Sequence, residues 1–310
     1  MKTIITESVR EAAGILRRGG IVAFPTETVY GLGAPIFNPS SISRIFEAKS
    51  RPADNPLIAH ISDLSQIEDL TEFLPDYGKR IIDAFYPGPL TIVVRKKPTV
   101  PDIATAGLDS VGIRMPDQTL ARELIEAAGT PLVAPSANVS GKPSPTTWQA
   151  VLEDLDGRID CILKGETTRY GLESTVVDCT GGAPSILRRG AVTFEELKTV
   201  VPEITDVADN DPDKPKSPGL KHRHYSPSAA VAFYTPNAEK SESAYIGIAV
   251  PSCEFRKAKI VNDAGEYARV LYEFFRECDR DKIDKIYCEE IPETGIGAAV
   301  MDRIRRAIAR

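Results

Sequence analysis

The sequence predicts an α/β fold, with a twisted mixed sheet in a first domain and a second, smaller α/β domain after it. Helix and strand patterns alternate along the chain. Many of the strand patterns are followed by Gly, Pro and Ser turns instead of a crossover helix, which favours a mixed sheet over a strictly parallel one. Residues 202–219 are rich in Pro, Asp and Lys and have almost no apolar periodicity, which indicates a linker.

The first domain, residues 1–204, opens with a predicted helix over 8–18 and a buried strand over 21–25. Ser8 and Glu11 fit a capping box for that helix, and two glycines end it. Further helices are predicted near 40–49, 76–85, 118–128, 146–155 and 193–200. Further strands are predicted near 57–61, 90–95, 111–115, 131–135, 159–164, 174–179 and 185–189.

The second domain, residues 229–310, follows a linker at 205–228. Its predicted elements are strands at 231–234, 244–250 and 283–288 and helices near 264–277 and 296–308. A unit of about 80 residues buries little core by itself. We therefore expect it to pack against the first domain.

The composition excludes several classes of protein. Of the 310 residues 42% are apolar and 26% are charged, as in ordinary globular proteins, and the net charge of −6 argues against non-specific binding of nucleic acid. The five cysteines are scattered without a CxxC pair, which argues against a disulfide framework or a zinc site and suits a reducing cytoplasm. No apolar run approaches the ~20 residues that span a bilayer, so no membrane role is expected.

The segment FPTETVYGLG (24–33) runs from a buried strand into a polar stretch with two glycines. Thr26, Thr28 and Tyr30 offer hydroxyls to a small polar ligand, and glycines permit a close approach of the backbone. A plain turn after a strand explains the segment equally well. It is neither a Walker A loop nor a GxGxxG loop.

The segment EAKSRPADNPLIAHI (47–61) carries Lys49 and Arg51 at the predicted end of a helix, with Asn55 in a proline-stiffened loop. Fixed cations of this kind suit a triphosphate. They also complement a helix dipole, and that alternative is the commoner one for such a pair. His60 lies near the end of the next strand, where a structural hydrogen-bonding role is the commoner one.

In VGIRMP (111–116), Arg114 alternates with apolar residues and therefore needs a partner if its strand is buried. The carboxylate of a substrate would serve, held by two N–H groups. An internal Asp or Glu would serve equally.

Two further segments join polar groups to strand ends. In PLVAPSANVSGKPSPTT (131–147) an apolar strand feeds a run with Ser136, Asn138 and Ser144 ahead of a helix, which suits an anion site or a solvated loop. In 171–190, Ser174 opens a strand and Arg188 ends the next one, where arginines are commonly solvated. No nucleophile elbow or metal-ligand cluster accompanies these groups, which favours a transfer enzyme that works by positioning and charge.

As an ordered set, these segments resemble the threonylcarbamoyl-AMP synthase family in its longer, two-domain form. The resemblance covers most of the chain, and each motif is weak alone. The motifs are FPTETVYGLG, KSRPADNPL, FYPGPLT, SVGIRMP, APSANVSGKPSPT, ESTVVD, ILRRG and, at the end of the linker, SPGLKHRHYSP.

The resemblance implies a YrdC-like domain with a twisted sheet and a positively charged cavity, followed by a small Rossmann-like domain. It implies that L-threonine captures bicarbonate or CO₂ as a carbamate, which then attacks the α-phosphorus of ATP and releases pyrophosphate. The product would pass to a separate enzyme that transfers the threonylcarbamoyl group to tRNA. We expect no stable binding of nucleic acid, no membrane partner and a cytoplasmic location.

The resemblance also assigns residues. The candidate catalytic residues are Lys49 and Arg51. The candidate threonine-binding residues are Thr28, His60, Arg114, Ala134 and Ser174, with the carboxylate on Arg114. The candidate ATP-binding residues are Arg51, Asn55, Ser110, Ser136, Asn138, Ser144, Arg188 and Tyr225.

The linker would be a lid that excludes water from a labile product, with Tyr225 reaching back over the ATP site. Mg²⁺ is expected with ATP, held mostly by phosphates and water. His222 stands where an aromatic residue is expected in the linker motif. With His224 it forms an HxH pair, but no third ligand lies near in the sequence, so we expect no metal site there.

Two rival functions come from other classes of protein. A non-catalytic RNA-binding module would use a concave basic surface of the same fold, but the acidic composition and the scarcity of aromatic residues in the basic segments argue against it. A carbamoyl-transfer maturation factor would carry zinc-finger-like cysteine pairs, and the sequence contains none.

Overall fold

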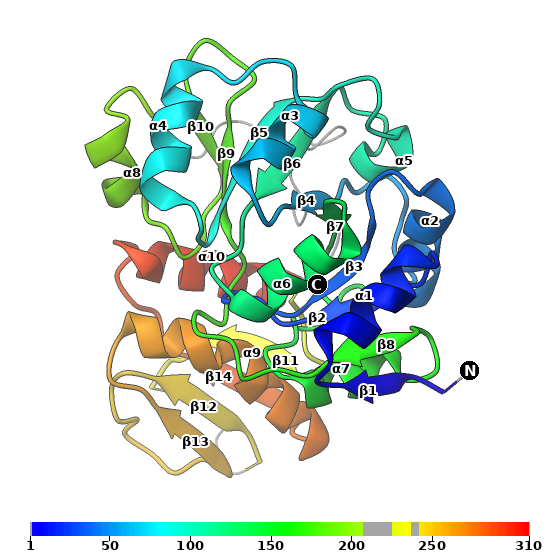
Figure 1. Ribbon diagram of the computed structural model, residues 1–310. Helices are drawn as coiled ribbons and strands as arrows, with labels where there is room; N and C mark the ends of the chain where they lie inside the picture. The colour runs from blue at the N-terminus through cyan, green and yellow to red at the C-terminus, as the bar shows by residue number, and fades with distance from the viewer. Residues whose placement is uncertain (1, 207–224, 237–241, 310) are drawn as a thin grey trace.

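The computed structural model describes residues 2–206, 225–236 and 242–309 and contains two sheets (Figure 1). The large sheet has ten strands in the order β1-β8-β2-β3-β7-β4-β6-β5-β9-β10 and mixes parallel with antiparallel pairs. The small sheet has four parallel strands in the order β11-β14-β12-β13. The predicted mixed sheet with a second, smaller α/β unit is confirmed.

The strands of the large sheet come from the first two-thirds of the chain. They are β1 Ile4–Thr6, β2 Val22–Phe24, β3 Gly31–Pro35, β4 Ile58–His60, β5 Leu90–Arg95, β6 Ser110–Arg114, β7 Leu132–Val133, β8 Cys161–Leu163, β9 Thr175–Asp178 and β10 Ser185–Arg188. The helices of this part are α1 Val9–Arg17, α2 Pro39–Lys49, α3 Ile67–Leu70, α4 Asp76–Phe85, α5 Asp102–Thr105, α6 Thr119–Ala128, α7 Trp148–Leu155 and α8 Phe194–Val200, with a 3₁₀ turn at Leu64–Gln66.

The helices begin and end where the local sequence dictates. In α1 the side chain of Ser8 accepts from the backbone N–H of Glu11 at 3.3 Å, and in α8 Thr193 and Glu196 form a capping box. Helix α2 ends at Ser50, which has a left-handed backbone (φ 50°), and Pro52 follows it. This sharp end carries the chain from the helix directly into the predicted loop with Arg51.

The glycines of the 24–33 segment lie in a strand, β3, and not in a turn as the simplest interpretation of the sequence had it. Strand β3 pairs antiparallel with β2, so the ring of Phe24 crosses the backbone of Gly33. A Cβ at Gly33 would lie 2.8 Å from that ring, which is too close for two carbon atoms. The glycine is therefore required for the close approach, and the polar residues 25–30 form a tight connection between two buried strands.

The second domain contains β11 Ala230–Phe233, β12 Ala244–Gly247, β13 Lys257–Ile260, β14 Lys285–Cys288, α9 Ala264–Arg280 and α10 Ile296–Ile308. Its core is not closed, because Val29 and Leu172 of the first domain belong to the same apolar cluster. Figure 1 shows α10 between the two sheets. Arg276 of α9 also reaches Asp154 of α7, at 2.9 Å, in a buried ion pair between the domains. The expected packing of the small unit against the first domain is thus observed.

Sequence patterns missed the short elements β1, β3, α3, α5 and β13. These run for five residues or fewer, too few to establish a period. Most of the predicted linker, with His222 and His224, lies outside the described residues. Within the described ranges, no helix is long and apolar enough to cross a bilayer.

Candidate active site

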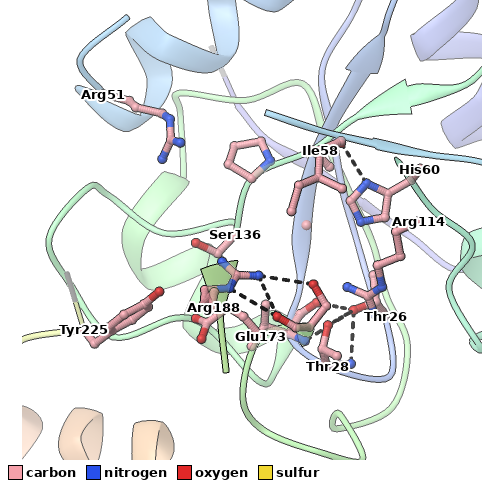
Figure 2. A pocket seen from close by; sticks show the side chains of 15 residues that line it. Thr26, Thr28, Arg51, Ile58, His60, Arg114, Ser136, Glu173, Arg188 and Tyr225 are labelled. Atoms are coloured by element: carbon pink, nitrogen blue, oxygen red, sulfur yellow. Dashed lines mark hydrogen bonds between the residues drawn. The ribbon is translucent and has the colours of Figure 1, made fainter. Parts of the chain in front are cut away.

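A pocket that is partly open to solvent lies where β4, β6 and the loops after β2 and β7 meet (Figure 2). It is lined by Thr26, Thr28, Val29, Gly31, Arg51, Ile58, His60, Arg114, Ala134, Pro135, Ser136, Glu173, Ser174, Arg188 and Tyr225. Nine of the residues predicted from the sequence are among them, drawn from segments up to about two hundred positions apart.

One side of the pocket holds Thr28, His60 and Arg114 (Figure 2). His60 and Arg114 end neighbouring parallel strands, and the register of β4 and β6 places them opposite each other. The carbonyl of Ile58 lies 3.0 Å from Nδ1 of His60, so Nδ1 carries the proton that it donates. Burial, with the positive charge of Arg114, lowers the pKa of His60 to about 3. The ring is therefore neutral at physiological pH.

Arg114 has an internal partner as well as a place in the pocket. Its Nη2 lies 2.7 Å from Oε1 of Glu27, and both side chains are almost fully buried. Its Nε donates to the carbonyl of Gly88 at 3.4 Å. The alternative of an internal carboxylate is thus observed. Arg114 also lines the cavity, and binding of a substrate carboxylate there stays a prediction.

The opposite side holds Arg51 and Tyr225, with Ser136, Glu173 and Arg188 between the two sides (Figure 2). Arg51 donates to the carbonyls of Asn55 and Pro56 at 3.3 and 3.2 Å, and burial lowers its pKa to about 10. Arg188 donates to the carbonyl oxygen of Ser174 at 2.9 Å. Burial lowers the pKa of Arg188 too. With a pKa of about 10, Arg51 is still charged at neutral pH. This side is therefore cationic.

Lys49 is fully buried but is not among the pocket-lining residues. Its ammonium donates to the carbonyls of Ser136 and Asn138, each at 2.5 Å. Burial lowers its pKa well below the usual range, and the charge of Arg51 adds to this. In this structure Lys49 holds the loop after β7 and does not face the cavity.

Four other predicted contacts also lie outside the pocket lining. Asn138 accepts from the hydroxyl of Ser136 at 2.6 Å and so orients that hydroxyl. Ser144 donates to Glu173 at 2.6 Å, and Asn55 presents its carbonyl to Arg51. Ser110 opens β6, at the opposite end of the strand from Arg114.

Glu173 and Glu27 are the residues at this site that the sequence interpretation missed. Glu173 is 7% exposed and lines the pocket beside Ser174. Burial would raise its pKa, but the charges of Arg303 and Arg188 and the hydrogen bond from Ser144 outweigh burial and lower it. The available signal was its position, because an acidic residue immediately before a buried strand needs a cation nearby.

Comparison with known proteins decides the family. A family model described as "Telomere recombination" matches residues 14–190, and one described as "Threonylcarbamoyl-AMP synthase, C-terminal domain" matches residues 192–309. The curated threonylcarbamoyl-AMP synthase of Pyrococcus abyssi is 43% identical over 96% of this chain and 93% of its own length. The chain belongs to the threonylcarbamoyl-AMP synthase family. The curated family member of Bacillus subtilis is 42% identical over 96% of this chain and 92% of its own length.

Solved structures of the family extend the comparison to three dimensions. The crystal structure of P. abyssi Sua5 complexed with L-threonine has a TM-score of 0.90 and 41% identity, and the match covers 99% of this chain and 97% of that one. A variant of the same P. abyssi protein, with two residues replaced by alanine, gives a TM-score of 0.91 at 40% identity over 99% and 96% of the two chains. The two-domain arrangement is therefore shared with the P. abyssi protein.

The described residues offer no dedicated site for Mg²⁺. They contain no group of three or more His, Cys, Asp or Glu side chains that could hold a metal ion. The two carboxylates nearest the pocket, Glu27 and Glu173, are each paired with an arginine. A metal ion that enters with ATP, held by phosphates and water, is compatible with this set of residues.

Proposed function

We propose that this chain is an L-threonylcarbamoyladenylate synthase, a nucleotidyltransferase that makes threonylcarbamoyl-AMP and pyrophosphate from L-threonine, bicarbonate or CO₂, and ATP. The observation that carries the proposal is the division of one pocket into two chemically different sides. Arg114 and the neutral His60 line one side, and the cations Arg51 and Arg188 lie across the cavity and between the sides. Full-length relatives bear the name of this activity.

On the amino-acid side, Arg114 binds the carboxylate of L-threonine, while Thr28, His60 and Ser174 surround the rest of the molecule. A neutral imidazole suits this position, since a second positive charge beside Arg114 would repel its guanidinium. Ala134 borders the cavity with a small side chain beside β3, which leaves room for the ligand. The amine of threonine then faces the middle of the pocket.

On the nucleotide side, Arg51 and Arg188 offset the charge of the phosphates, Ser136 donates a hydroxyl, and Tyr225 covers the cavity. The amine captures CO₂ as a carbamate and loses a proton. A carbamate oxygen attacks the α-phosphorus, and the bond from that phosphorus to the pyrophosphate oxygen breaks. Fixed cations accelerate this step because they stabilise the charge of the leaving pyrophosphate without reorganising.

Mg²⁺ would enter as the counter-ion of ATP and neutralise part of the phosphate charge. The product is a mixed anhydride that water hydrolyses, which suits a buried site and a cover over it. A separate tRNA-modifying enzyme in the cytoplasm would consume the product, and we propose no stable binding of nucleic acid by this chain itself.

The decisive experiment measures pyrophosphate release from ATP with L-threonine and bicarbonate, each omitted in turn. Release that requires all three substrates supports the proposal. Release independent of threonine contradicts it. A salt-sensitive complex with RNA and no turnover of ATP would favour a non-catalytic RNA-binding module instead.

A further inference from the structure

Glu173 joins the pocket to the second domain through short polar contacts. The hydroxyl of Tyr272 on α9 donates to its two carboxylate oxygens, at 3.0 and 3.2 Å. Nε of Arg303 on α10 donates to Oε2 at 2.9 Å. From the first domain, Ser144 donates to Oε1 at 2.6 Å. One carboxylate at the wall of the pocket is thus held by groups from both domains.

The same two residues of the second domain also hold Tyr225. The rings of Tyr225 and Tyr272 are stacked, with centroids 5.5 Å apart, and the guanidinium of Arg303 lies 5.0 Å from the centre of the Tyr225 ring. Tyr225 has a left-handed backbone (φ 64°), which is unfavourable for a residue with a side chain. The stack and the cation hold the ring and help to offset the cost of this backbone conformation.

These contacts are deeply buried. Arg303 is completely inaccessible to solvent, and its other contacts are with the adjacent Asp302 and the backbone carbonyl of Arg189. A buried carboxylate that accepts several hydrogen bonds is held in one orientation and is a poor proton acceptor. Glu173 is consequently suited to orient its neighbours and not to serve as a general base.

On the opposite side of the pocket, the polar contacts of Arg114 and His60 remain within the first domain. Arg114 contacts Glu27 and Gly88, and His60 contacts Ile58, all in the first domain. Ser144 and Arg188, by contrast, interact with Glu173 directly or through charge. The polar contacts of the second domain therefore support the cationic side of the pocket, whereas Val29, beside Thr28, packs against that domain through apolar contacts.

We propose that Tyr272 and Arg303 are positioning residues for the nucleotide, acting through Glu173 and Tyr225. The inference rests on the proposed function, because it assigns ATP to the cationic side. It predicts that weakening the contact of either residue with Glu173 lowers the affinity for ATP and leaves the affinity for L-threonine nearly unchanged. A purely structural role would affect both ligands alike.

The test uses two conservative variants of the full chain, Tyr272→Phe and Arg303→Lys. Tyr272→Phe removes the hydroxyl and keeps the stacked ring, and Arg303→Lys keeps the charge but loses the directed Nε–H contact. Calorimetry with a non-hydrolysable ATP analogue and with L-threonine gives both affinities separately. We expect the analogue to bind about fivefold to tenfold more weakly in each variant, as for the net loss of one hydrogen bond. We expect the affinity for L-threonine to change less than about twofold.

Ile304→Ala is the matched control. Ile304 is completely buried in the core of the second domain, next to Arg303 in the sequence. The control should lower the temperature of unfolding and leave the affinity for the analogue within about twofold of the wild type. The inference is wrong if Ile304→Ala lowers the affinity for the analogue as much as Tyr272→Phe does. It is also wrong if Tyr272→Phe leaves that affinity unchanged. Both outcomes can be read even where Arg303→Lys fails to fold.

The two proposals fail in different ways. A wild-type chain that binds the analogue but releases no pyrophosphate with threonine would contradict the proposed function. The comparison of affinities among the variants would still decide whether Tyr272 and Arg303 position the nucleotide. A wild-type chain that releases pyrophosphate normally while Tyr272→Phe binds the analogue at full affinity would contradict the further inference only.

Discussion

Arg114 and Glu27 form an ion pair of 2.7 Å in which both side chains are almost completely buried. Glu27 belongs to the connection between β2 and β3, and Arg114 ends β6. The pair holds the guanidinium in place before any ligand arrives. A guanidinium has five N–H donors, and the contacts of Arg114 with Glu27 and Gly88 engage only Nη2 and Nε. A substrate carboxylate can therefore bind a cation that is already oriented.

The internal carboxylates do not cancel the charge of the pocket as a whole. Glu27 offsets Arg114, and the charge of Glu173 is offset by Arg303, which lies behind the pocket wall. Arg51 and Arg188 add positive charge beyond these two pairs. The cavity therefore carries the cations Arg51 and Arg188 on the side that the proposal assigns to the nucleotide, even though the net charge of the chain is negative.

Arg114→Lys should raise the threonine requirement far more than the ATP requirement. Lysine keeps the charge opposite Glu27 but cannot bind a carboxylate with two parallel N–H groups. We expect a loss of about 2–3 kcal/mol in threonine binding, roughly a 30- to 150-fold rise in KM for threonine. Steady-state release of pyrophosphate with each substrate varied checks this. Equal effects on both substrates would count against the carboxylate assignment.

Arg51→Ala and Lys49→Ala should both abolish pyrophosphate release, but for different reasons. Arg51 lines the pocket, so its loss should act mainly on ATP binding. Lys49 satisfies the carbonyls of Ser136 and Asn138, so its loss leaves two buried acceptors unpaired and should lower the free energy of unfolding by about 2 kcal/mol or more. Denaturant unfolding together with ATP titration separates the two effects. Threonine-dependent release at the wild-type rate in both variants would refute the assignment.

The sequence predicts the larger helices and strands because each carries its own periodicity, as in α6 and β5. It also predicts which polar segments reach the pocket, through the ordered set of motifs. It does not predict the partner of Arg114, because Glu27 lies 87 positions away and meets it only through the order of the strands. The pairing of Arg303 with Glu173 is not predicted for the same reason, since contacts between domains leave no local pattern in the sequence.

His60 should make the protein less stable as the pH falls. The pKa of His60 is about 3 in the folded chain, against about 6.5 for an unfolded histidine. Between these values the unfolded chain binds a proton that the folded chain does not, so the stabilisation present above pH 6.5 is lost progressively toward pH 3. Between pH 6.5 and 5 the loss should be about 2 kcal/mol.

His60→Gln provides the reference for this pH dependence, because glutamine has no titrating group. Urea unfolding at several pH values should give a shallower decline for the variant than for the wild type, whatever its stability at neutral pH. Parallel curves for the two proteins would contradict this prediction, because they would mean that His60 gains its proton at the same pH in the folded and the unfolded chain.

The isolated first domain, residues 1–204, should lose pyrophosphate release. Removing the second domain exposes Val29 and Leu172 and takes away the partner of Glu173 in α10. Leaving a buried charge without its partner costs about 3–5 kcal/mol, enough to disorder this side of the pocket. Full activity of residues 1–204 would show that neither the cover over the site nor the second domain is needed for the reaction.

Gly190→Ala should impair the site, whereas Gly182→Ala should not. A Cβ at Gly190 would lie 2.3 Å from the backbone nitrogen of Thr175 and 2.5 Å from the carbonyl oxygen of Glu173. Backbone atoms cannot rotate away, so the methyl group must displace the start of β9, beside the pocket. We expect a loss of about 1–3 kcal/mol in the free energy of unfolding and weaker binding of both ligands, because Glu173 and Ser174 move together.

At Gly182 a Cβ would meet nothing within 4 Å, so that variant controls for the substitution itself. Unchanged affinities in Gly190→Ala would mean that the Glu173–Ser174 backbone can shift without cost to the site.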